Sequence, residues 1–221
     1  MLTIGSMQPV NLQGRSLRIA CGIVAAVMII CFCSFISVLW KANHRSKYGP
    51  LHLAADSGDA DEVRRLLAGG LDVNLRSAPV GFTALHVAAD QGEVEVARVL
   101  LEYGAKVDLR DSEGDTALYL TAAQSSGRAQ MKSTEAGRND VARLLLEHGA
   151  DANAANHFGD TPLHGAIHSD DADLVVLLLD HGADPSKSNS EGRSPIDHAG
   201  HMPTGEPGKF LHLLESHRLK K

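Results

Sequence analysis

Histidine is the residue type whose number and spacing in this chain most readily suggest chemistry. The 221 residues include 12 histidines, and His164 and His168 lie four positions apart. On a helix, this spacing places two imidazoles on one face, where they could share a metal ion. Zinc sites take three or four protein ligands, however, and two imidazoles without a third ligand rarely suffice. We therefore expect no metal site and no metal cofactor.

Motifs of the common catalytic and cofactor-binding families are absent from the sequence. It contains no G-x-S-x-G, no H-E-x-x-H, no phosphate-binding loop and no Gly-rich dinucleotide fingerprint. The three cysteines, Cys21, Cys31 and Cys33, lie in one apolar run, so the rest of the chain offers neither a disulfide nor a thiolate ligand. The sequence predicts a protein that is not an enzyme, has no cofactor and takes no small-molecule substrate.

Charge is divided unevenly along the chain. Residues 1–48 contain five Lys or Arg residues and no Asp or Glu, and the whole chain has a formal net charge of −6. Subtracting the +5 of the first segment leaves −11 for residues 49–221. Because neutralising phosphates requires clustered Lys and Arg, this acidic segment argues against a nucleic-acid partner. It favours a protein partner that has a basic face.

An uncharged segment from Ile19 to Trp40 indicates a membrane anchor. Its 22 residues would form a helix of about 30 Å, enough to cross the hydrocarbon layer. A secretory signal peptide is the alternative, but its apolar part usually has about 7–15 residues and ends at a small-residue cleavage site. Two basic residues precede the segment and three follow it within the next seven residues. This difference of one charge favours the cytoplasmic side for the remainder of the chain.

The rest of the chain repeats one four-residue motif. Thr-Ala-Leu-His at 83–86 returns as Thr-Ala-Leu-Tyr at 116–119, as Thr-Pro-Leu-His at 161–164 and as Ser-Pro-Ile-Asp at 194–197, and Gly-Pro-Leu-His at 49–52 precedes them. A period in the low thirties, with Leu-Leu and Gly-Ala following the motif in three of its copies, resembles the ankyrin repeat. The resemblance implies an all-α solenoid of helix-turn-helix units, joined by hairpin-like fingers, that binds other proteins.

Local signals within the second unit are consistent with this architecture. Thr83 can cap a first helix over residues 84–91, and the His86 ring can hydrogen-bond back toward the cap. Gly92 opens the turn to a second helix with an apolar face, which Gly104 terminates. Because a helix pair of this size buries too little surface alone, each unit must pack on the next.

These observations give a division of the whole chain. We expect an N-terminal tail (1–18), a transmembrane helix (19–40), a basic juxtamembrane linker (41–48) and a repeat domain (49–221), with units at 49–80, 81–113, 114–158 and 159–191 and a degenerate cap at 192–221. The third unit is longer because residues 125–136 are inserted between its two helices as a surface loop. In the fourth unit, Asp170 takes the position of Gly92.

The resemblance also indicates where a partner would bind. In proteins that look like this, partners usually lie across the concave side, made of the finger tips and the exposed edge of each first helix. Phe82 and Phe158 are either exposed anchors, because aromatic residues supply much of the energy of interfaces, or they pack onto neighbouring fingers. Carried over position by position, the candidate residues are Phe82, Asp90, Gln91, Asp115, Gln124, His157, Phe158 and His168.

The sequence therefore predicts a membrane-anchored scaffold or adaptor that binds a partner protein on the concave surface. Two alternatives remain open. The chain could be an exported or periplasmic protective module, or it could be the regulatory subunit of a separately encoded enzyme.

Overall fold

The computed structural model describes residues 48–123, 135–200 and 210–214. The predicted membrane helix at 19–40, the candidate residue Gln124 and most of the predicted insertion lie outside these residues. Within the described ranges, no helix is both long and apolar enough to cross a membrane.

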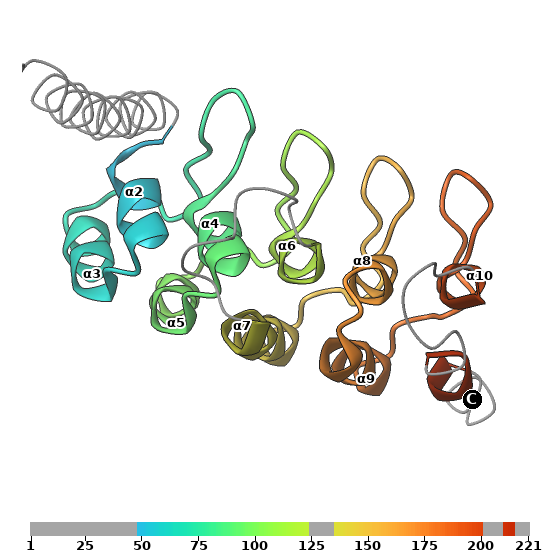
Figure 1. Cartoon of the computed structure of the whole chain (residues 1–221). Coiled ribbons are helices and arrows are strands. Elements are labelled where there is room, and N and C mark those ends of the chain that lie inside the picture. The colour runs from blue at the N-terminus through green and yellow to red at the C-terminus, as the bar shows by residue number, and fades with distance from the viewer. Residues whose placement is uncertain (1–47, 124–134, 201–209, 215–221) are drawn as a thin grey trace, which may run out of the picture. The chain divides into compact units, whose positions relative to one another are not determined.

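Regular structure in the described residues is helical throughout, as the repeat pattern predicts. Figure 1 shows the helices in two layers, with α2, α4, α6, α8 and α10 next to the long loops and α3, α5, α7 and α9 behind them. We call these layers the inner and the outer helices. The bounds are α2 Pro50–Ser57, α3 Ala60–Ala68, α4 Ala84–Gln91, α5 Val94–Glu102, α6 Ala117–Ala122, α7 Glu135–Glu147, α8 Pro162–His168, α9 Ala172–Asp180 and α10 Pro195–Gly200; residues 210–214 are also helical.

Long loops lead from each outer helix to the next inner helix, and all of them project from the same side of the inner layer (Figure 1). We number these fingers first (70–82), second (104–115), third (149–160) and fourth (182–193). The core runs without interruption between the two layers, because equivalent leucines in successive units are fully buried. These are Leu51, Leu85, Leu118 and Leu163 on the inner helices and Leu100, Leu145 and Leu178 on the outer helices, each at most 2% exposed.

The start of α4 shows how the sequence fixes a helix end. The Thr83 hydroxyl accepts a hydrogen bond from the His86 amide, and the Thr83 amide donates to Nδ1 of the His86 ring at 3.2 Å. Because Nδ1 is an acceptor, the ring hydrogen is on Nε2, which donates to the carbonyl of Asp115, 3.2 Å away. The predicted cap and the predicted helix over 84–91 are both confirmed.

Three histidines make the same connection between units. Nε2 of His52 lies 2.9 Å from the Phe82 carbonyl, and Nε2 of His164 lies 3.1 Å from the Arg193 carbonyl. With His86 they form a set that we call the bridging histidines, each joining an inner helix to the finger that follows. Burial lowers the pKa of all three imidazoles, so the neutral form that these bonds require is the stable one at neutral pH.

The turn between the two helices of a unit requires a left-handed backbone. Gly92 has φ +71°, and a Cβ there would lie 3.0 Å from the Arg138 amide nitrogen of the next unit. Neighbouring units therefore approach too closely at this turn for a side chain. Asp170, the predicted counterpart of Gly92, also has positive φ, at +57°, a conformation that Asp tolerates better than most residues.

Helix α7 differs from the prediction at its start. The loop was expected over residues 125–136, but Glu135 and Ala136 already belong to α7, which has 13 residues where α5 has nine. Both residues are good helix formers, and α7 is four residues longer than α5, which is about one turn. The predicted loop therefore ends two residues too late.

Candidate protein-binding surface

In three of the four fingers, an Asp or Asn side chain closes the loop at the tip by accepting hydrogen bonds from two backbone amides. Asp111 Oδ1 accepts hydrogen bonds from the amides of Glu113 and Asp115, both at 2.8 Å. Asn156 and Asn189 occupy the equivalent positions and accept the equivalent pairs of amide hydrogens at 3.0–3.1 Å. Each tip is thus held in one conformation by its own sequence.

Backbone hydrogen bonds join each finger to the one before it. The amide of Ser112 donates to the Val80 carbonyl at 2.9 Å. Likewise, the amide of His157 donates to Glu113 at 3.0 Å, and the amide of Ser190 donates to Phe158 at 2.8 Å. The finger tips therefore form one continuous surface rather than four separate loops.

Side-chain amides add a second set of bonds between fingers. Asn156 Nδ2 donates to Asp115 Oδ1 at 2.9 Å, and Asn189 Nδ2 donates to Asp160 Oδ1 at 2.8 Å. Burial, with a smaller contribution from the nearby charges of Asp111, Glu113 and Asp160, raises the pKa of Asp115 to about 6, against the hydrogen bond from Asn156. The carboxylates of Asp111, Glu113 and Asp160 therefore lie close enough to Asp115 to affect its ionisation.

The two candidate phenylalanines have different environments. Phe82 is 7% exposed, and its ring stacks on the His86 ring with centroids 5.7 Å apart. The expectation of an exposed anchor is wrong for Phe82, because it directly precedes the capping Thr83 at the base of the finger. Phe158 is 56% exposed. It lies at a finger tip, where a partner could reach it.

The other candidates fall into two groups. Asp90 is buried, and Gln91 is half-buried and donates to the Asp90 carboxylate at 3.2 Å. Asp115 is half-buried, whereas His157 and His168 are exposed. The structure therefore brings Asp115, His157 and Phe158 together on joined fingers, and places Asp90, Gln91 and His168 at the ends of the inner helices.

The paired histidines have separate environments. His164 is a bridging histidine whose ring also contacts the ring of His198 edge-on, at 5.6 Å, while His168 is exposed at the end of α8. Over the described ranges, no three His, Cys, Asp or Glu side chains are grouped so that they could hold a metal ion.

Sequence reasoning missed four finger residues that define this surface: Glu113, Asn156, Asn189 and Glu191. The asparagines stand 33 positions apart in the sequence, and Asp111 precedes Asn156 by 45, which is the same spacing plus the predicted 12-residue insertion. The recurrence of Asp or Asn at the repeat spacing could therefore have revealed the tip-closing role.

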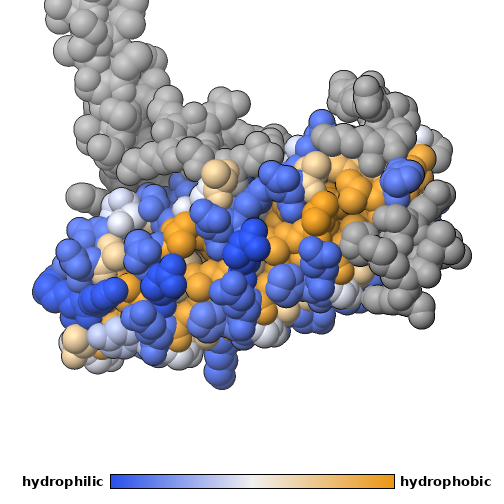
Figure 2. Space-filling view, turned by 90° about the horizontal axis from the view of Figure 1, so that it is seen from below, coloured by the Kyte–Doolittle hydropathy of each residue, from blue (hydrophilic) through white to orange (hydrophobic). Residues whose placement is uncertain are grey.

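The opposite side of the solenoid, made by the outer helices, differs along its length. Figure 2 shows polar side chains over its α3 and α5 end and more apolar surface toward α9. Arg64, Arg98 and Arg143 are exposed on α3, α5 and α7, whereas half-buried Val176 takes the equivalent place on α9.

Comparison with known proteins adds one positive finding. A family model described as ankyrin repeats (3 copies) matches residues 29–111, 51–132, 109–189 and 129–206, which together cover most of the chain. No curated protein matches the sequence.

Proposed function

Because the chain belongs to the ankyrin repeat family, whose repeats are protein–protein interaction modules, we propose that it is a membrane-anchored scaffold or adaptor. In this proposal, a partner protein binds the concave surface made by the fingers and the inner helices. Proteins built only from such repeats typically lack catalytic activity, which agrees with the absence of catalytic motifs from the sequence.

The joined finger tips are the observation that carries this proposal. Hydrogen bonds of 2.8–3.0 Å run from each finger to the one before it, so the surface is ordered before a partner arrives. Binding to a preordered surface avoids the entropic cost of ordering loops during association. Phe158, 56% exposed at the third tip, supplies an aromatic side chain of the kind that anchors interfaces.

Membrane anchoring rests on the sequence alone. The uncharged run at residues 19–40, flanked by basic residues, is the support for a transmembrane helix, and the excess of one basic residue after it supports a cytoplasmic location for the repeats. An anchor would confine the domain and its partner to one membrane surface and so raise their effective concentration.

Proximity labelling in cells tests the proposal directly. A labelling enzyme is fused after Lys221 of the full chain, and the labelled proteins are compared between wild type, Phe158→Ala with His168→Ala, and Tyr103→Ala with His148→Ala. The second pair is a matched control, because Tyr103 (45% exposed) and His148 are exposed at the ends of α5 and α7.

We expect a set of labelled cytoplasmic proteins that is lost in the Phe158→Ala, His168→Ala variant and retained in the Tyr103→Ala, His148→Ala control. The chain itself should stay in the membrane fraction after alkaline extraction. Labelling confined to an exported compartment would support the protective module instead. A stoichiometric enzyme among the lost proteins would support the regulatory-subunit alternative. An unchanged set with the concave pair would contradict binding on that surface.

A further inference from the structure

We propose that the finger tips dock a cationic polypeptide segment of the partner, with Phe158 receiving a Lys or Arg side chain between Glu113 and Glu191. This inference rests on the proposed function and specifies the chemistry of the partner.

The position of Phe158 in the row of tips is the first support. Val80, Glu113, Phe158 and Glu191 take equivalent places in the four fingers, because each directly precedes the finger glycine, which is Gly81, Gly114, Gly159 or Gly192. The hydrogen bonds from His157 to Glu113 and from Ser190 to Phe158 make these tips neighbours. Backbones joined in this way lie about 5 Å apart. Phe158 is therefore flanked by a carboxylate-bearing residue on each side.

An exposed aromatic residue with a glutamate at the equivalent place of each neighbouring finger suits a cationic side chain. The ring face attracts a guanidinium or an ammonium group, and the carboxylates can pair with the same group or with its neighbours on the partner. An apolar segment placed here would instead remove Glu113 and Glu191 from water without a counter-charge, which is unfavourable. The surroundings of Phe158 thus favour a basic occupant over a hydrophobic one.

Two of the five Lys and Arg residues on the fingers, Arg110 and Lys187, are engaged away from Phe158. Arg110 Nη1 donates to the carbonyls of Gly114 and Ala155, and Lys187 Nζ donates to the carbonyl of Asn153 at 2.7 Å. In the described part of the chain, the ion pair on the fingers is Arg193–Glu191 at 3.0 Å, with side chains 61% and 62% exposed. Because exposed pairs of this kind contribute little, a partner cation can replace Arg193.

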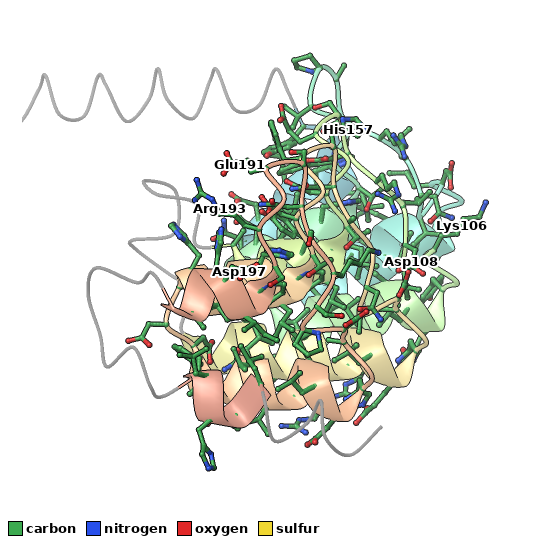
Figure 3. All side chains as sticks on the ribbon, turned by 90° about the vertical axis from the view of Figure 1, so that its right-hand side faces the viewer. Lys106, Asp108, His157, Glu191, Arg193 and Asp197 are labelled. Atoms are coloured by element: carbon green, nitrogen blue, oxygen red, sulfur yellow. The ribbon has the colours of Figure 1, made fainter. Side chains whose placement is uncertain are left out.

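The charge of the surface agrees with this assignment. Burial is the main cause of the raised pKa of Asp115, and the nearby carboxylates of Asp111, Glu113 and Asp160 add to it; a bound cation would offset the repulsion among these carboxylates. Figure 3 shows Glu191, Arg193 and Asp197 on one side of the fingers, with Lys106 and Asp108 on the opposite side. The negative net charge of residues 49–221 would also steer a basic segment toward the domain.

Fluorescence anisotropy with defined peptides tests the inference. The full-length chain, held in a neutral detergent, is titrated into a labelled peptide of alternating glycine and arginine, with the glutamate counterpart as the comparison. The variants are Phe158→Ala, Phe158→Leu, and Glu113→Gln with Glu191→Gln. Glu102→Gln with Glu147→Gln is the matched control, because it removes two exposed carboxylates from the outer helices α5 and α7.

We expect the arginine peptide to bind and the glutamate peptide not to bind. Phe158→Ala and Phe158→Leu should each weaken binding about three- to fivefold, because both remove the aromatic face. The double Glu variant should weaken binding by at least a similar factor and reduce its dependence on salt, while the control pair should bind like wild type.

Absence of binding by the arginine peptide overturns the inference, as does equal weakening by the finger pair and the control pair. Wild-type affinity in Phe158→Leu also overturns the role of the ring. If the anisotropy experiment fails but proximity labelling still identifies partners that depend on the concave surface, the proposed function stands and only the inference of a basic partner segment is refuted. If neither experiment shows binding, both proposals fail.

Discussion

Replacing Gly49 with threonine should stabilise the first repeat unit. His52 Nδ1 is fully buried and has no hydrogen-bond partner, whereas the Nδ1 atoms of His86 and His164 each contact a threonine hydroxyl at 2.8 and 2.9 Å. Gly49 occupies the threonine position. His52 Nδ1 therefore lacks the threonine hydroxyl that its two counterparts contact.

The structure has room for the new side chain. Gly49 has φ −72° and ψ 172°, close to the −96° and 165° of Thr161, and both residues precede a proline at the start of a helix. A Cβ at residue 49 would meet His52 Nδ1 at 3.7 Å and Leu75 Cδ2 at 3.9 Å, which are ordinary contacts. No backbone shift is therefore needed to accept threonine.

The expected increase in the free energy of unfolding has two parts. Replacing glycine with any compatible residue lowers the entropy of the unfolded chain and contributes about 0.4–1 kcal/mol. The hydroxyl adds a hydrogen bond to His52 Nδ1, with a net value of about 0.5–1.5 kcal/mol. Gly49→Val has nearly the shape of threonine and lacks the hydroxyl, so it measures the first part alone. We expect Gly49→Thr to raise the free energy of unfolding by about 1–2 kcal/mol and Gly49→Val to give about half of this.

Urea unfolding followed by circular dichroism gives the overall change, and hydrogen exchange in α2 shows whether it arises in the first unit. Equal stability of the threonine and valine variants would refute the reasoning about His52. A threonine variant no more stable than wild type would refute the argument about space and entropy as well.

Three further predictions concern the core, the turns and pH. Leu100→Asp should cost more than about 3 kcal/mol, because Leu100 is 0% exposed and the variant buries an unpaired charge; an unchanged cooperative melt would contradict this. Gly92→Ala should destabilise the domain more than Gly104→Ala in urea titrations, since both have positive φ but only Gly92 faces the next unit within 4 Å; equal losses would exclude the close approach. Burial lowers the pKa values of the bridging histidines in the folded chain. As pH falls, the unfolded chain therefore binds protons at these histidines before the folded chain does, and the free energy of unfolding should fall below about pH 6.5. The pKa of Asp115 is raised to about 6, so this group makes the folded chain more stable as pH falls and would mask the effect of the histidines. The pH series should therefore be measured in an Asp115→Asn variant. A free energy of unfolding that stays constant or rises from pH 7 to 5.5 in this variant would contradict neutral bridging histidines.

Predictions from sequence succeeded where a structural feature depends on nearby residues. The start of α4 follows from Thr83 and His86, and its end follows from Gly92, all within nine residues of one another. The start of α7 was predicted less well, because the repeat alignment extended the preceding loop to residue 136, two residues into the helix. Local chemistry, rather than the period alone, set the accuracy of these boundaries.

The candidate surface was harder to predict, because exposure depends on packing between units. Phe82 and Phe158 are both finger phenylalanines, but one precedes the helix cap and stacks on His86, while the other lies at a tip. Aligning the fingers by Asp111 and Asn156 separates the two positions. The pairing of Asn156 with Asp115 joins residues 41 positions apart and becomes evident only in three dimensions.

The bonds that join the units also bear on how the chain acquires its structure during synthesis. A bridging histidine reaches a carbonyl 29 or 30 residues further along, and each finger bonds to the one made just before it. As a new unit leaves the ribosome, the preceding unit to which it bonds has therefore already been synthesised. Assembly can proceed from the amino-terminal end, one unit at a time, without waiting for the carboxyl terminus.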